Sequence, residues 1–121
     1  MASAELKTVI DMLRAAPMMA GNDPLELRAG MAAATALAPP PTNATVTLVD
    51  AGGAPAEWTD ADGVSGDAAI VYLHGGGYIM GNLDSHRRLV ANLSEASGIR
   101  ALSVDYGLAP ENIFPQAVEA A

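Results

Sequence analysis

The residues best suited to chemistry form one short run in the middle of the chain. An uncharged, apolar segment, residues 68–73, leads directly into His74, Gly75, Gly76 and Gly77. Three glycines after a buried strand let the backbone turn sharply and expose its N–H groups. Exposed amides can bind an anion, and in acyl transfer they would hold the oxyanion of a tetrahedral intermediate. An ordinary glycine-rich turn has the same composition, so the glycines alone leave both interpretations open.

Two other groups of residues also look catalytic. Ser65 lies in the sequence GVSGD, which lacks the last glycine of the G-x-S-x-G nucleophile motif and precedes a strand instead of following one. We therefore interpret Ser65 as a turn hydroxyl. Asp84, Ser85 and His86 are consecutive, and neighbours on a helix point about 100° apart, so they cannot pass a proton in sequence. We expect a helix cap and a structural histidine there, not a catalytic triad.

The surrounding pattern predicts the elements that hold this run. Residues 1–41 show helical spacing of apolar side chains at 6–13 and 25–37 and end in three prolines. The pattern then changes to strands at 44–49, 56–59, 68–73 and 100–104, with the beginning of a helix at 115–121. Since the first two strands have only a turn between them, we expect an antiparallel start that leads into a parallel core.

A further helix should connect the glycines to the last strand. We expect Asp84 or Ser85 to cap it and Gly98 to end it. Its spacing predicts four inward-facing side chains, Leu89, Val90, Leu93 and Ala96. The strand at 68–73 is apolar throughout, and this is typical of a strand covered on both faces.

Composition excludes several classes of function. The chain has 121 residues, no cysteine and a mean hydropathy of +0.22, so it is globular without disulfides or a thiol nucleophile. Six Lys and Arg against fourteen Asp and Glu give a net charge of −8, which excludes a basic nucleic-acid face. Two histidines twelve residues apart favour no metal site. Without a membrane span or signal-peptide pattern, we expect a cytoplasmic location. We expect no cofactor, because the acyl-transfer chemistry considered for the glycine run needs none.

The glycine run becomes more informative with its flanks. Residues 70–86 resemble the histidine-box signature of the hormone-sensitive-lipase-like esterases and lipases, a family of α/β-hydrolases. The matching features are the apolar residues before HGG, Tyr78 after the glycines, Asn82, and the pair Ser85-His86. Downstream, DYGLAPENIFPQA is similar to the family's second block, DYRLAPEHPFPAA.

Two residues of the second block depart from the family pattern. Gly107 stands where the family usually has arginine, and Asn112 stands where it has histidine. Because glycine cannot replace the multi-donor head of arginine, we expect a looser loop after Asp105.

The resemblance covers roughly residues 56–121 and implies a fold. It implies an α/β protein, namely the N-terminal part of an α/β-hydrolase sheet of about four strands, as an incomplete fold. Residues 1–41 would be N-terminal cap helices over the acyl pocket, and residues 42–121 would be the first half of the core.

The resemblance also implies an activity, the hydrolysis of carboxylic esters with short or medium acyl groups. Gly75, Gly76 and Gly77 would supply most of the oxyanion hole, Gly76 above all, and Tyr78 would line the substrate pocket. His74, His86 and Asp105 would be structural residues at the site. The serine, acid and histidine of the triad would lie beyond Ala121, so the chain by itself would be inactive.

Two alternatives remain beside the esterase. One is a non-catalytic relative that binds a small-molecule ligand in the same pocket. The other is an inactive structural fragment that complements a C-terminal fragment or a second copy of itself. The second alternative rests on the strand at 68–73, which in the family would pair with a strand absent from these residues and so leave an open edge.

Overall fold

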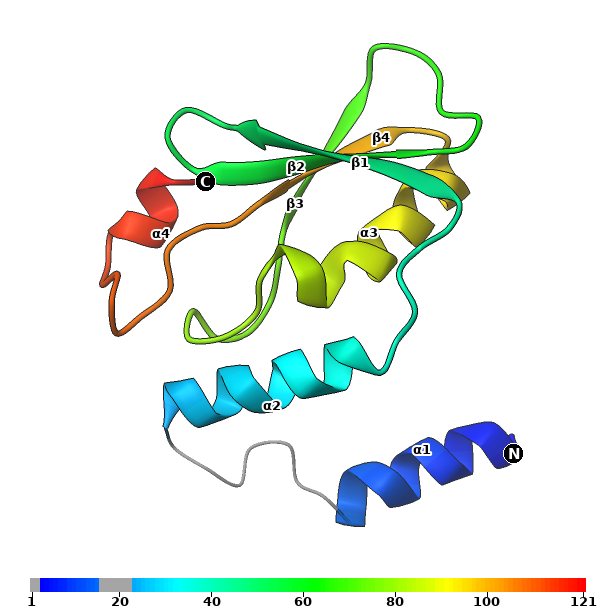
Figure 1. The fold of residues 1–121 in the computed structure, drawn as a ribbon, viewed down its shortest axis with the longest axis vertical. Coiled ribbons are helices and arrows are strands. Elements are labelled where there is room, and N and C mark those ends of the chain that lie inside the picture. Colours follow the sequence, from blue (N-terminus) through cyan, green and yellow to red (C-terminus); the bar gives the residue numbers. More distant parts are fainter. Residues whose placement is uncertain (1–2, 16–22) are drawn as a thin grey trace.

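The computed structural model describes residues 3–15 and 23–121. The predicted break between the first two helices falls on residues 16–22, outside the described residues. The elements, in chain order, are α1 (Ala4–Ala15), α2 (Pro24–Ala36), β1 (Ala44–Asp50), β2 (Pro55–Ala61), β3 (Ala69–Leu73), α3 (Leu83–Ser97), β4 (Arg100–Val104) and the one-turn helix α4 (Gln116–Glu119) (Figure 1). No helix in this part of the chain is long and apolar enough to cross a membrane.

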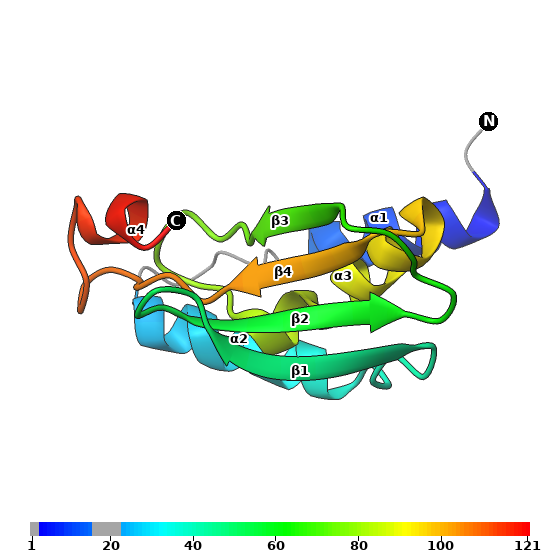
Figure 2. The ribbon, with the colours of Figure 1, turned by 90° about the horizontal axis from the view of Figure 1, so that it is seen from above.

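The four strands form one mixed sheet with the order β1-β2-β4-β3. The β1–β2 and β2–β4 pairs are antiparallel, and β3 and β4 are parallel on either side of the α3 crossover. The expected antiparallel start and parallel core are therefore confirmed. Figure 2 shows β3 and β4 pointing the same way, with α4 beyond their carboxyl ends. The glycine run follows β3 directly and so lies at that end of the sheet.

Helix α3 covers one face of the sheet. Its buried residues are Val90, Ala91 and Ser94, whereas Leu89 and Leu93 are 48% and 38% exposed. Ala96 is exposed as well, so the predicted inward orientation is confirmed for Val90 and wrong for the two leucines and Ala96. The inner side carries small residues because Ser94 Oγ accepts from the Ala61 N–H and donates to a strand carbonyl, which requires a close approach of the helix.

The cap of α3 also differs from the prediction. Asn82, not Asp84 or Ser85, is the N-cap residue, because its side chain accepts from the Ser85 N–H at 2.8 Å. Ser85 Oγ in turn accepts from the Asn82 N–H at 3.0 Å, which completes a reciprocal capping box.

The opposite face of the sheet has a small core and an uncovered part. Ala54, Ala56 and Val104 form the core, with Ala120 packed against it. Within the described residues β3 pairs only with β4, and Val71 is 61% exposed. The expectation that β3 is covered on both faces is therefore wrong for this part of the chain, since α3 covers one face only.

Candidate functional site

The loop after β3 needs glycine for conformational reasons. Gly76 and Gly77 have φ angles of 137° and 63°, in the region that L side chains rarely adopt. A Cβ at Gly76 would lie 1.9 Å from the Met80 carbonyl oxygen, so the turn can close only on a glycine. Tyr78 also has a positive φ of 61°, a strained conformation that neighbouring groups must hold.

Three successive carbonyl oxygens of this loop are held by hydrogen bonds. The His74 carbonyl accepts from the Tyr106 hydroxyl. The Gly75 carbonyl lies 3.0 Å from His74 Nδ1, which must carry the proton because a carbonyl can only accept. The Gly76 carbonyl accepts from the N–H groups of Ile79 and Met80 at 3.2 Å.

These bonds orient the N–H groups of residues 75–77. In a trans peptide the C=O and the following N–H point in opposite directions. The N–H groups of residues 75, 76 and 77 therefore point in the direction opposite to the carbonyls of residues 74, 75 and 76, and away from the donors that these carbonyls accept from. None of the three donates a hydrogen bond to any of residues 3–15 or 23–121.

The same glycines line a cavity of about 440 Å³. Its other walls come from the carboxyl end of β3, from two tyrosines and from the C-terminal segment. The lining residues there are Leu73, His74, Tyr78, Tyr106, Ala117, Val118 and Ala121. Three unpartnered donors beside a largely apolar hollow are an arrangement that can bind an oxyanion. A larger cavity of about 730 Å³ lies between α2, the prolines 39–41 and the loop 105–112, and residues 75–77 do not line it.

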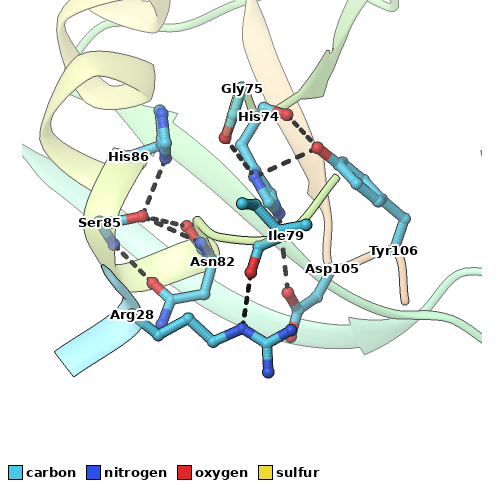
Figure 3. Close-up of polar contacts among 9 residues, drawn as sticks. All are labelled: Arg28, His74, Gly75, Ile79, Asn82, Ser85, His86, Asp105 and Tyr106. Atoms are coloured by element: carbon cyan, nitrogen blue, oxygen red, sulfur yellow. Dashed lines mark hydrogen bonds and ion pairs between the residues drawn. The ribbon is translucent and has the colours of Figure 1, made fainter. Parts of the chain in front are cut away.

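His74 lies at the centre of the site (Figure 3). Its ring is buried between those of Tyr106 and His86, with centroid distances of 4.4 and 5.4 Å. Its Nε2 lies 3.9 Å from a carboxylate oxygen of Asp105. Burial raises the pKa of Asp105, and the neighbouring His74 partly opposes that rise. Gly81 leaves room for the ring, since a Cβ there would lie 2.5 Å from His74 Nδ1.

The consecutive residues 84–86 do not form a triad. Ser85 Oγ does lie 2.9 Å from His86 Nδ1. Asp84, however, pairs with Arg87 at 2.6 Å, and the Ser85 hydroxyl is already engaged in the cap. Burial, followed by the proximity of His74, lowers the pKa of His86. Ser65 is exposed in the loop before β3, at the opposite end of that strand from the glycines.

Arg28 of α2 belongs to the site although its sequence context gives no sign of it. Its guanidinium donates to the Ile79 and Ala109 carbonyls, both at 2.7 Å, and pairs with both carboxylate oxygens of Glu111. These partners lie 51 to 83 residues away along the chain. The only local signal is an arginine in an alanine-rich helix, and a helical arginine is more often solvated.

The two residues that depart from the family pattern lie against each other. A Cβ at Gly107 would be 2.6 Å from Asn112 Cγ, so the asparagine side chain occupies the space beside the glycine. The Asn112 N–H donates to the Leu108 carbonyl at 2.9 Å. The predicted loosening of this loop remains a prediction.

We expect Tyr106→Phe to lower the free energy of unfolding by about 1 kcal/mol, because it removes the hydroxyl that the buried His74 carbonyl accepts from. Urea denaturation measures the change. Tyr78→Phe is the matched control, since Tyr78 is 64% exposed and should change stability by less than about 0.5 kcal/mol. Equal effects of the two variants would contradict the role of the Tyr106 hydroxyl.

Glu111 should make stability depend on acidic pH. Its hydrogen bonds with Arg28 lower its pKa from 4.5 to about 2. A carboxylate with a lowered folded-state pKa stabilises the fold above the unfolded-state value, and this contribution is lost as the pH falls from about 4.5 to about 2. We expect the urea midpoints of the wild type and Glu111→Gln to converge across this interval. A difference that stays constant down to pH 2 would contradict the ion pair.

Comparison with known proteins shows what the chain is similar to. Residues 70–121 match a protein-family model described as "alpha/beta hydrolase fold". Acetyl esterases of Salmonella typhi and Salmonella enteritidis are 46% identical over 52 residues, which are 43% of this chain and 16% of each esterase.

Solved structures match almost the whole chain. An esterase from the bacterial hormone-sensitive lipase family superposes with a TM-score of 0.88 and 34% identity, over 99% of this chain and 40% of that one. An esterase/lipase from an uncultured bacterium gives a TM-score of 0.87 and 38% identity, over 98% and 41%. The chain thus spans about two-fifths of the length of these structures. It has the N-terminal part of the α/β-hydrolase fold, and its resemblance to the esterases of the hormone-sensitive lipase family is confirmed.

Proposed function

We propose that this chain supplies the oxyanion hole and part of the substrate pocket of a carboxylic ester hydrolase. The observation that carries the proposal is the set of three free N–H groups at residues 75–77, oriented by held carbonyls and bordering a cavity. During acyl transfer the ester carbonyl oxygen becomes negatively charged, and these donors would stabilise that charge in the transition state.

The nucleophile, acid and base would come from residues beyond Ala121. Within the described part of the chain, no serine lines the cavity beside the glycines. Its lining combines glycines and alanines with the rings of His74, Tyr78 and Tyr106 and with two aliphatic side chains, Leu73 and Val118. A cavity of this size and composition suits a short or medium acyl group. Residues 1–41 would cap the pocket above the core formed by residues 42–121. The proposal needs neither a metal ion nor an organic cofactor.

A chimaera tests the proposal directly. Residues 1–121 would replace the matching N-terminal part of a related esterase, and hydrolysis of p-nitrophenyl acetate and butyrate would be measured. We expect turnover by the chimaera and none by the 121-residue chain alone. A chimaera that unfolds cooperatively but does not turn over would contradict the proposal and favour a non-catalytic ligand-binding protein. Turnover by the chain alone would contradict the placement of the nucleophile.

The open edge of β3 supports the structural-fragment alternative as a second candidate. Among the described residues the strand pairs with β4 alone, and Val71 and Leu73 are 61% and 46% exposed. Such an edge can add a strand from another chain or from a second copy. We expect Val71→Lys to reduce self-association of the 121-residue chain in size-exclusion chromatography. A wild-type chain that elutes as a monomer at all concentrations would contradict self-pairing.

A further inference from the structure

Arg28 connects helix α2 to the two loops that form the site. Its Nε donates to the Ile79 carbonyl of the glycine loop, and its Nη2 donates to the Ala109 carbonyl of the loop that follows β4. Glu111 holds the other side of the guanidinium through two contacts of 2.8 and 2.9 Å. One side chain therefore satisfies two peptide carbonyls from segments that lie far apart in the sequence. Figure 3 shows the bond from Arg28 to the Ile79 carbonyl.

The two segments held by Arg28 also hold the strained part of the glycine loop through backbone N–H groups. The Met80 N–H, which shares a peptide unit with the Ile79 carbonyl, donates to the Gly76 carbonyl at 3.2 Å, and this bond fixes the direction of the Gly77 N–H. The Ala109 N–H donates to the carbonyl of Tyr78, the non-glycine residue with φ of 61°. A conformation of this kind persists only when its surroundings determine it. Arg28 acts on the residues directly after the three free amides.

We propose that Arg28 is a positioning residue for the oxyanion loop, so that the orientation of the glycine N–H groups depends on the docking of α2. The inference rests on the proposed function for its catalytic consequence, but the coupling itself is a property of the folded chain. Lysine cannot reproduce it, because an ammonium has no planar fork that reaches two carbonyls and a carboxylate together. Glu111 orients the guanidinium without touching the glycine loop.

Hydrogen exchange in the 121-residue chain tests the coupling without any catalysis. In Arg28→Ala we expect the N–H groups of Met80 and Ala109 to exchange about tenfold faster, because the peptide unit of the Met80 N–H loses its anchor at the Ile79 carbonyl and Ala109 loses the bond to its own carbonyl. Added guanidinium should restore slow exchange in Arg28→Ala, whereas a loss of helix packing alone would not respond to it. Arg88→Lys is the control, since Arg88 is exposed on α3 and bonds neither loop. Unchanged exchange in Arg28→Ala, or faster exchange that guanidinium does not reverse, would overturn the proposal.

The catalytic consequence is measured separately in the esterase chimaera. We expect Arg28→Lys to lower kcat about tenfold with KM nearly unchanged, because misplaced donors affect the transition state more than substrate binding. Glu111→Gln should lower kcat less than Arg28→Lys. If Gly76→Ala leaves hydrolysis intact, the oxyanion-hole function fails whatever Arg28 does. If Gly76→Ala abolishes hydrolysis while Arg28→Lys leaves kcat unchanged, the positioning role of Arg28 is overturned and the oxyanion-hole function stands.

Discussion

Gly76→Ala is expected to reduce ester hydrolysis by the chimaera about 10²–10³-fold, the loss typical of one oxyanion-hole donor. The added Cβ would lie 1.9 Å from the Met80 carbonyl oxygen and 3.2 Å from its Cγ. A contact of 1.9 Å with backbone cannot be relieved by a side-chain rotation, so the turn from Gly76 to Met80 must open. Opening breaks the two bonds that the Gly76 carbonyl accepts, and the Gly77 N–H then loses its fixed direction. The expected effect is therefore on kcat.

Gly53→Ala provides the matched control for backbone strain. Gly53 has a positive φ of 105° in the turn between β1 and β2, and a Cβ there would meet nothing within 4 Å. It should cost about 1 kcal/mol of stability and leave kcat unchanged, because the strain is similar but Gly53 does not line the cavity beside the glycine loop. Thermal denaturation of both variants separates unfolding from loss of activity. Equal kcat values for folded Gly76→Ala and Gly53→Ala would contradict the oxyanion role of the loop.

The elements of this fold could be predicted where a local pattern determines them. The predicted strand at 100–104 and the observed β4 have the same bounds, because an apolar run between a C-cap glycine and a loop admits few alternatives. The burial of α3 could not be predicted in the same way. Leu89 and Leu93 have the stronger hydrophobic signal, but a small, hydrogen-bonding Ser94 faces the sheet instead. Which side of the helix faces the sheet depends on the strands that the helix crosses. The spacing of apolar residues within the helix does not contain this information.

In the candidate site, too, only the residues with a local sequence pattern could be predicted. The glycines could be found because the oxyanion hole proposed for them needs specific residue types within four positions of one another. The side chains that hold the glycine loop could not be predicted, since Arg28 lies 51 residues from Ile79 and Tyr106 lies 32 residues from His74. Nothing in an isolated arginine or tyrosine indicates which carbonyl it will bind after folding. The contribution of such residues becomes visible only when the two loops are seen together at the end of the sheet.

The buried ion pair between Glu57 and Arg87 should have the largest effect on stability. Glu57 is 0% exposed on β2, in the layer between the sheet and α3. Its two oxygens accept from Arg87 Nε at 3.0 and 3.2 Å and from Arg87 Nη2 at 2.7 Å. No local pattern pairs these residues, which lie 30 positions apart. Within residues 3–15 and 23–121, Arg87 is the only side chain that donates to this buried carboxylate.

Removal of that partner is expected to be costly. Arg87→Met should lower the free energy of unfolding by about 3–5 kcal/mol, because it leaves an uncompensated charge inside the molecule. The double variant Glu57→Met with Arg87→Met should recover most of the loss, since two apolar side chains of similar length remove the charge and fill the space. Urea denaturation measures both, with exposed Arg88→Met as the control expected to stay within about 0.5 kcal/mol of the wild type. If the double variant is no more stable than Arg87→Met, the ion pair contributes through packing, and the desolvated charge is not the cause.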